Sequence, residues 1–248
     1  MGGGGGDPEP APAGPREVRA LLLDVDGTLA ETERHGHLAA SNATFRELDL
    51  PVEWSWEDFL DLYPIPGNAR RLRHWLQTRT DWPDPRIQEA VEAFRERKQE
   101  IYIRDFLPGL ELRPGVRRLL REAVARDLRL AVVSTSHERQ IHALLDQLLP
   151  EYRNDVEAVY GKETAVKTGP EGRLYAVALA RLGLRPFQAV AIEDSPEGAE
   201  AAVRVGIPTA VFYTDMTASA GFPGARLVAR SLDLFDLDGL LEACTGRS

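Results

Sequence analysis

Two aspartates one residue apart, Asp24 and Asp26, follow a short apolar run and precede a glycine and a threonine. Carboxylates this close repel each other unless a cation holds them, and hard oxygen ligands suit Mg²⁺. A carboxylate can also attack phosphorus and form an aspartyl phosphate. The second carboxylate could protonate the leaving oxygen and later activate water. The stretch therefore indicates metal-assisted phosphoryl transfer; the alternative is an ordinary acidic turn, in which Asp and Gly are common.

Two further polar clusters also follow apolar runs. Ser134 and Thr135 offer hydroxyl and backbone donors just before a helix expected from His137, and a helix N-terminus binds phosphate readily. A plain N-cap cluster is the alternative. Glu193 and Asp194 end a later run, and four carboxylates gathered at one edge of a sheet would repel strongly without a cation. These residues strengthen the prediction of Mg²⁺.

Phosphoryl transfer also needs a positive charge beside the transferring group. The chain has lysines only at positions 98, 162 and 167, and the last two lie in the half of the chain that contains most of the strands. We predict that Lys167 binds phosphate, because it precedes a helix on the loop after a weaker strand. The alternative is a solvated surface lysine, since most lysines are exposed.

The elements that must position these residues alternate along the chain. We expect strands at 18–23, 128–133, 156–160, 189–192 and 209–212, and helices at 116–126, 137–148, 174–182, 196–205 and 234–243. This alternation predicts an α/β fold, a doubly wound parallel sheet with right-handed crossovers. The carboxyl ends of its strands would bring the polar clusters together at the edge where such sheets bind ligands.

The stretch from 34 to 104 has no strand signal and shows helical patterns at 31–48, 56–63, 68–78 and 85–103. We expect an all-helical insert at 34–104 between the first strand and the rest of the sheet. The core domain would comprise 16–33 and 105–248. Four tryptophans fall in the insert, and we expect them in its core, since large aromatic side chains mostly serve packing.

Composition limits the classes of function. The chain has 248 residues and a formal net charge of −9, which argues against nucleic-acid binding. Cys244 is the sole cysteine, so an intramolecular disulfide is excluded and a reducing compartment is favoured. No apolar run is long enough to span a membrane. Residues 1–15 lack the features of a signal peptide, and we expect a disordered tail. The expectation is a cytoplasmic monomer without nucleic-acid or membrane partners.

The order Asp-Val-Asp-Gly-Thr at 24–28, then Ser134, Lys167 and Glu193-Asp194, resembles the haloacid dehalogenase (HAD) superfamily of phosphohydrolases. The resemblance implies that superfamily's Rossmann-like core, and the insert is similar to its C1-type cap. Four segments look like the CbbY subfamily, whose members dephosphorylate xylulose-1,5-bisphosphate, a misfire product that inhibits Rubisco: Leu29 to Arg34, Gly36-His37, Lys98 to Tyr102 and Leu112 to Val116.

The resemblance implies roles for the residues at the first and third strand ends. Asp24 would be the nucleophile and Asp26 the general acid and base. Mg²⁺ would be held by the Asp24 carboxylate, the Asp26 carbonyl oxygen and Asp194, with Glu193 bound directly or through water.

The resemblance also implies how the substrate is held. Ser134 and Lys167 would bind the transferring phosphoryl group, with Thr135 beside them as a further donor. Glu31 and His37 match positions that face the substrate at the hinge of the cap.

The sequence departs from the family pattern at two places. The usual Lys-Pro-x-Pro-Asp corresponds to Lys167 to Arg173, which is two residues longer. The cap signature Gly-Gly-Lys-x-Arg corresponds to Gly67 to Arg71, where Arg71 matches and Ala69 replaces the lysine. Bidentate guanidinium contacts suit phosphate, so Arg71 is a candidate residue for binding the far end of the substrate. A solvated basic face is the alternative.

The leading interpretation is a Mg²⁺-dependent phosphatase of a small phosphorylated sugar, with xylulose-1,5-bisphosphate as a candidate. A phosphosugar mutase of the β-phosphoglucomutase type shares every core residue and stays open. Intact Asp24, Asp26 and Asp194 argue against a non-catalytic phosphosugar sensor. A dehalogenase has no use for Asp26 as an acid, and a phosphonatase needs a cap lysine for a Schiff base. Lys98 is the only lysine of the insert, and we expect it to be structural.

Overall fold

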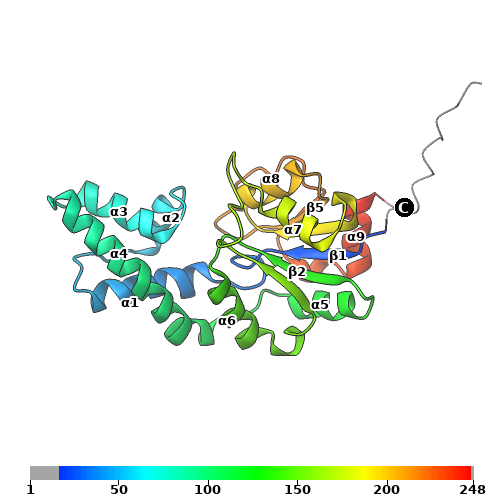
Figure 1. The fold of residues 1–248 in the computed structure, drawn as a ribbon, viewed down its shortest axis with the longest axis horizontal. Helices are drawn as coiled ribbons and strands as arrows, with labels where there is room; N and C mark the ends of the chain where they lie inside the picture. Colours follow the sequence, from blue (N-terminus) through cyan, green and yellow to red (C-terminus); the bar gives the residue numbers. More distant parts are fainter. Residues whose placement is uncertain (1–16, 247–248) are drawn as a thin grey trace, which may run out of the picture.

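The computed structural model describes residues 17–246, and the tail expected at 1–15 lies outside this range. The described residues form a parallel sheet covered by helices, with a helical body at one end of it (Figure 1). In this part of the chain, no helix is both long enough and apolar enough to cross a membrane.

Six strands form one parallel sheet in the order β3-β2-β1-β4-β5-β6. Their bounds are β1 Ala20–Leu23, β2 Arg129–Val133, β3 Val156–Tyr160, β4 Ala189–Glu193, β5 Thr209–Phe212 and β6 Leu227–Ala229. The predicted parallel sheet is confirmed. The edge strand β6 was not predicted, because three half-exposed residues give too short an apolar run to recognise.

Helices cover both faces of the sheet, and this explains why the central strands are apolar throughout. In β1, Leu21 and Leu23 pack on one face and Ala20 and Leu22 on the other. The first face is covered by α5 (Val116–Val124), α6 (Glu138–Leu148) and α9 (Leu237–Thr245). The second is covered by α7 (Leu174–Leu182) and α8 (Pro196–Arg204).

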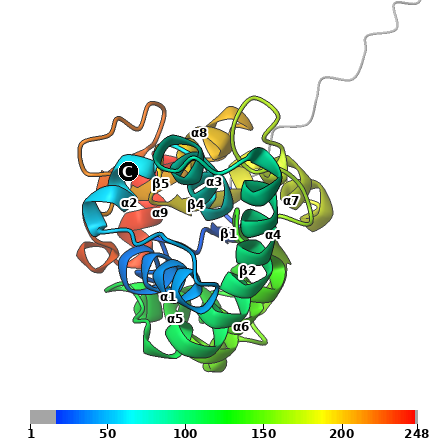
Figure 2. The ribbon, with the colours of Figure 1, turned by 90° about the vertical axis from the view of Figure 1, so that its left-hand side faces the viewer.

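Four helices that lie in the chain between β1 and α5 form the helical insert, and Figure 2 views the molecule with the insert in front. Its helices are α1 (Ala39–Glu47), α2 (Trp56–Leu62), α3 (Asn68–Arg79) and α4 (Asp84–Ile101). They enclose an apolar core of their own around Phe45, Trp54 and Phe94. Trp54 is fully buried, and the other three tryptophans pack half-buried against this core, as expected.

Both connections between the insert and the sheet are π-helical, at Glu33–Leu38 and Tyr102–Phe106. In the first, the His37 amide donates to the Thr32 carbonyl over 2.7 Å, where a regular helix at 31–48 was predicted. The His37 ring stacks on Tyr102, with ring centroids 4.7 Å apart. The expected boundaries at 34 and 104 fall inside these two turns, and the division into two domains there stays a prediction.

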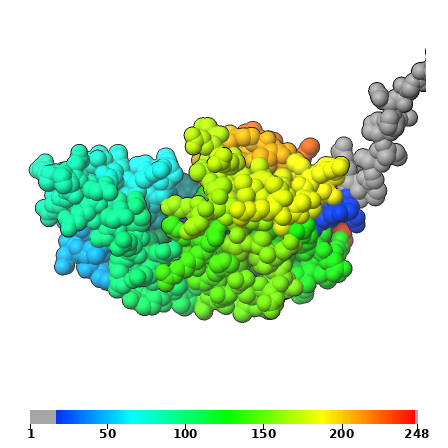
Figure 3. Space-filling view, in the orientation of Figure 1, coloured from blue at the N-terminus to red at the C-terminus, as the bar shows by residue number. Residues whose placement is uncertain are grey.

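A hollow separates the insert from the core on the face of the molecule shown in Figure 3. Tyr63, at the end of α2, lies close enough to Asp194 and Glu33 for their charges to raise the pKa of its hydroxyl, although burial is the larger cause. Met216, on the loop after β5, packs against the apolar core of the insert. The insert therefore lies over the carboxyl edge of the sheet.

Candidate active site

Three neighbouring strands bring the predicted polar clusters to one edge of the sheet. Asp24 follows β1, Ser134 follows β2, Glu193 ends β4 and Asp194 follows it. Each of the four is at most 6% exposed. Because β2, β1 and β4 are adjacent and parallel, residues far apart in the sequence meet here.

The carboxylates of Asp24, Glu193 and Asp194 form a compact cluster, with one oxygen of each within 4.8 Å of the others. Burial raises the pKa of Asp24, raises that of Asp194 well above its usual value, and raises that of Glu193 to about 7. Three buried carboxylates cannot all ionise without a nearby positive charge. Oε2 of Glu193 is buried and has no hydrogen-bond partner among the described residues. This oxygen-rich cluster fits a hard divalent cation such as Mg²⁺.

Two glycines leave room for these carboxylates. Gly27 has φ +77°, and a Cβ there would lie 2.8 Å from Cγ of Asp194. A Cβ at Gly198, on α8, would lie 2.9 Å from Oε1 of Glu193. Separations under 3 Å are essentially never found for a real Cβ, so neither position accepts a side chain without moving a carboxylate.

Lys167 lies between two members of the carboxylate cluster. Its Nζ is 2.6 Å from Oδ1 of Asp24 and 2.7 Å from Oε1 of Glu193, and its side chain is 2% exposed. Burial alone would lower the pKa of this lysine, but the two carboxylates outweigh it and hold the pKa above its usual value. The lysine is therefore a fixed cation beside Asp24, although its loop is longer than the family pattern.

Asp26 is held by two partners from different elements. Oγ of Ser136 donates to its Oδ2, and Nε2 of His37 lies 3.2 Å from its Oδ1. Burial would raise the pKa of Asp26, but the charge and hydrogen bond of His37 and the bond from Ser136 together lower it below the usual range. Asp26 is thus ionised in this arrangement, which is the form that a general base needs.

Two residues near Asp26 were not predicted for the site. Lys98, on α4, has its Nζ 2.8 Å from Nδ1 of His37, and burial lowers its pKa to about 8. Oε2 of Glu33 is buried without a hydrogen-bond partner in the described chain, and burial raises the pKa of this carboxyl. Lys98 was expected to be structural, but it completes a row with His37 and Asp26. The signal in the sequence that could have pointed to Lys98 is that it is the only lysine of the insert.

Two of the other predicted side chains, those of Glu31 and Thr135, lie apart from the carboxylate cluster. Glu31 is 57% exposed at its side chain and pairs with Nε of Arg113 at 3.3 Å. Thr135 is exposed. Oγ of Ser134 is buried and accepts a hydrogen bond from the amide of Ser136 over 3.1 Å. The structure therefore brings Ser134 to the site but not the side chains of Glu31 or Thr135.

Arg71 is buried within the insert, where its guanidinium has three partners. Nε donates to the Ile65 carbonyl (2.9 Å), Nη1 to Oδ1 of Asn68 (3.0 Å) and Nη2 to the Tyr63 carbonyl (3.1 Å). The guanidinium also lies over the ring of Phe59, 4.8 Å from its centroid. These contacts hold the loop before α3 together, and a solvated basic face is wrong for this residue.

We expect Arg71→Ala to lower the free energy of unfolding by roughly 2 kcal/mol, because hydrogen bonds from a charged group are lost and two half-buried carbonyls lose their partner. Urea unfolding would measure this loss. Arg70→Ala is the matched control, since the neighbouring Arg70 is exposed. Unchanged stability combined with a loss of kcat/KM on a bisphosphate alone would instead assign Arg71 to substrate binding.

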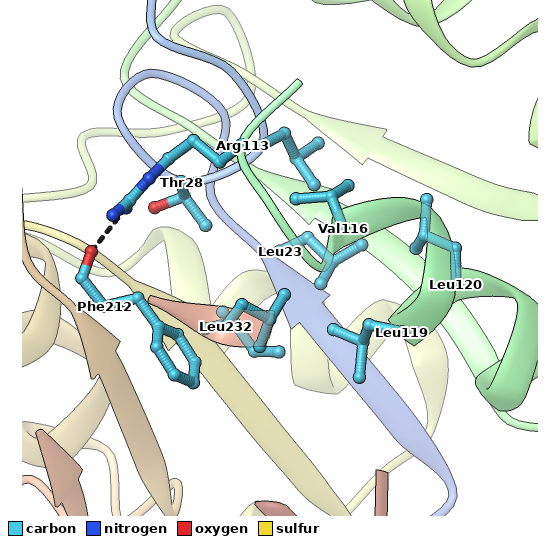
Figure 4. Close-up of a pocket in the computed structure, with 10 residues that line it drawn as sticks. Leu23, Thr28, Arg113, Val116, Leu119, Leu120, Phe212 and Leu232 are labelled. Carbon is cyan, nitrogen blue, oxygen red and sulfur yellow. Dashed lines mark hydrogen bonds between the residues drawn. The ribbon is translucent and has the colours of Figure 1, made fainter. Parts of the chain in front are cut away.

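A separate cavity lies behind the loop that follows β1, as Figure 4 shows. Its volume is about 10 Å³, and leucine and valine side chains such as Leu23 and Val116 line it. At its edge Arg113 donates to the carbonyls of Gly27 and Phe212. The cavity is too small and too apolar for a sugar phosphate. The hydrogen bonds of Arg113 join the loop at Gly27 to the end of β5.

Comparisons with known proteins show the family of this chain. The model of the haloacid dehalogenase-like hydrolase family matches residues 18–206. The plasmid CbbY protein of Cupriavidus necator is 37% identical over 216 residues, which cover 85% of this chain and 84% of that protein. A phosphorylated carbohydrates phosphatase of Thermotoga maritima is 34% identical over 191 residues, or 77% of this chain and 82% of that protein.

A solved structure shares the whole architecture. The crystal structure of CbbY from Rhodobacter sphaeroides in complex with xylulose-1,5-bisphosphate has a TM-score of 0.79 and 30% sequence identity, and the match covers 90% of this chain and 99% of that one. Family model, relatives and fold thus lead to one conclusion. The chain belongs to the haloacid dehalogenase-like hydrolases, among the CbbY-like proteins, and is an enzyme of the phosphatase type.

Proposed function

We propose that this protein is a Mg²⁺-dependent phosphatase that hydrolyses a small phosphorylated sugar through an aspartyl phosphate. The observation on which the proposal depends is the buried Lys167 beside Asp24, in a carboxylate cluster at the edge of the sheet. The relatives named for phosphorylated carbohydrates and for a xylulose-1,5-bisphosphate complex support the substrate class. Xylulose-1,5-bisphosphate is the candidate substrate.

In the first step, a carboxylate oxygen of Asp24 attacks phosphorus and the bond from phosphorus to the sugar oxygen breaks. Asp26, which takes up a proton from solvent before this step, gives that proton to the departing oxygen. Lys167 and donors at Ser134 neutralise the oxygens of the transferring group as their charge develops. The products are the free sugar hydroxyl and an acyl phosphate on Asp24.

In the second step, Asp26 takes a proton from water while the water oxygen attacks the acyl phosphate. The bond from phosphorus to the Asp24 oxygen breaks, which releases phosphate and restores the Asp24 carboxylate. Asp24, Asp194 and the Asp26 carbonyl oxygen would hold Mg²⁺, with Glu193 bound directly or through water. When bound, the ion supplies positive charge to the phosphoryl oxygens.

Residues of the insert side would bind the sugar and set the geometry of Asp26. His37 and Lys98 form a row behind Asp26, with separations of 3.2 and 2.8 Å, and we assign them to positioning its carboxylate. The unpartnered oxygen of Glu33 is suited to accept a hydrogen bond from a sugar hydroxyl, since a buried acceptor without a partner is costly.

The decisive experiment measures phosphate release from a panel of sugar monophosphates and bisphosphates, with Mg²⁺ and with EDTA. We expect turnover only with Mg²⁺, and for Asp194→Ala a rise in the Mg²⁺ concentration for half-maximal activity of at least roughly 10-fold, the scale of losing even an outer partner of a metal ligand. Asp215→Ala is the control, because the Asp215 side chain is 91% exposed.

Two results would overturn the proposal in different ways. Full activity in EDTA would remove the metal from the mechanism. Conversion of a sugar phosphate into its isomer without release of phosphate would make the enzyme a mutase of the β-phosphoglucomutase type.

A further inference from the structure

The loop between β3 and α7 has to hold the terminal amine of Lys167, a flexible side chain, at a defined position. Lys167 has a four-carbon stem with several rotatable bonds, so the position of its Nζ depends on where its backbone is held. Residues 161–173 contain no helix or strand. The backbone of Lys167 must therefore be fixed by contacts within this loop and with its neighbours.

The second half of the loop is closed on itself. The Val166 carbonyl accepts from the amides of Arg173 (2.9 Å) and Leu174 (3.1 Å), which joins the two ends. Inside this closure, the Gly172 amide donates to the Gly169 carbonyl over 3.0 Å. Residues 167–172 thus form a compact ring, the lysine ring, that begins at the catalytic-site lysine.

Gly172 packs directly against the peptide group of Lys167. A Cβ at position 172 would lie 2.9 Å from the carbonyl carbon of Lys167 and closer still to its oxygen. Both are backbone atoms, so the crowding could be relieved only by moving the backbone of Lys167 or of position 172. Gly221, by contrast, has nothing within 4 Å of where its Cβ would be.

The lysine ring is also fastened to the helix that follows the carboxylate cluster. Nη1 of Arg204, on α8, donates to the Gly169 carbonyl over 2.6 Å, and its Nη2 pairs with Glu200 at 2.8 Å. α8 begins at Pro196, two residues after Asp194, and includes Gly198 against Glu193. The lysine ring and the carboxylate cluster therefore both contact α8.

We propose that Gly172 is a positioning residue, which seats the lysine ring against the backbone of Lys167 and so keeps Nζ between Asp24 and Glu193, with Arg204 as a second fastening. This inference rests on the proposed function, in which Lys167 neutralises the transferring phosphoryl group. A methyl group at position 172 displaces the backbone of Lys167 and draws its Nζ away from Asp24.

A double-mutant cycle with p-nitrophenyl phosphate as substrate tests the proposal, using Gly172→Ala, Lys167→Ala and the double variant. We expect Gly172→Ala to lower kcat at least about 10-fold, since a misplacement of about 1 Å can cost 10²-fold. In the Lys167→Ala background, the same change should have no further effect, because residues that act through one group are not additive. Gly221→Ala should stay within about twofold of the wild type.

The possible failures can be told apart. If Lys167→Ala keeps wild-type activity, the proposed function is wrong. If Lys167→Ala is impaired but Gly172→Ala is not, or if the two losses multiply in the double variant, only the role of Gly172 is overturned. If Gly172→Ala unfolds at the same temperature as the wild type, its loss of kcat comes from a displaced lysine and not from a damaged fold.

A second variant keeps the test decisive if Gly172→Ala does not fold. Arg204 lies at the surface, so Arg204→Ala should fold and lower kcat by a smaller factor, about 3-fold. That loss of kcat should vanish in the Lys167→Ala background. Arg204→Lys, which keeps a hydrogen-bond donor, should recover part of the wild-type kcat. A loss of equal size in both backgrounds would overturn the proposal.

Discussion

Asp24→Asn is expected to lower kcat by at least about 10³-fold, because covalent catalysis is withdrawn while the size of the side chain is kept. The amide oxygen can still accept from Nζ of Lys167, now 2.6 Å from Oδ1 of Asp24, so the site should keep its shape. Steady-state turnover of a sugar phosphate, with thermal unfolding as the check on the fold, would measure the loss.

A chemical signature should accompany this loss of activity. Acid quenching during turnover should trap an acyl phosphate on the wild-type protein and none on Asp24→Asn. Asp215→Asn, a change at an exposed carboxylate, should behave as the wild type. Retention of more than a tenth of the activity by Asp24→Asn would contradict the aspartyl-phosphate mechanism.

Asp26→Ala should have an effect that depends on the leaving group. Alkyl phosphates release an alkoxide that needs a proton, whereas aryl phosphates release a phenolate that leaves unaided. We therefore expect kcat/KM to fall by roughly 10²–10⁴-fold on a sugar phosphate and far less on p-nitrophenyl phosphate. The two substrates can be compared in one preparation of the variant, which removes errors in active-site concentration.

Asp26→Asn is the matched variant, because it preserves an oxygen for the contacts with Ser136 and His37 but cannot carry the proton. It should show the same dependence on the leaving group as Asp26→Ala. Equal losses on both substrates would reduce Asp26 to a role in shaping the loop or holding the metal.

The strand ends of the site could be predicted because apolar runs locate buried strands well. Asp24, Glu193 and Asp194 follow or end such runs, and a parallel sheet leaves them only one edge to occupy. Lys167 could be chosen because the chain has so few lysines. In these cases the sequence contains both the residue and the element that positions it.

The insert side could not be predicted in the same way. A π-helical turn holds one residue more than an α-helical turn, and the turn at Glu33–Leu38 changes which side chains face the site. Glu33 and His37, which belong to this turn, lie near Asp26, whereas Glu31 precedes the turn and its side chain is 57% exposed. The contact between Lys98 and His37 joins residues that no local pattern relates, because it depends on how α4 returns to the core.

The position of β1 in the middle of the sheet has a consequence for the order of folding. Leu22 pairs with Ala131 on one side and Ala191 on the other, and both partners are synthesised after the entire helical insert. The insert is built from helices close in sequence, whose local contacts form quickly, whereas distant parallel pairing is slow. As the chain leaves the ribosome, Asp24 thus emerges before the insert, yet its surroundings are completed only when β4 arrives.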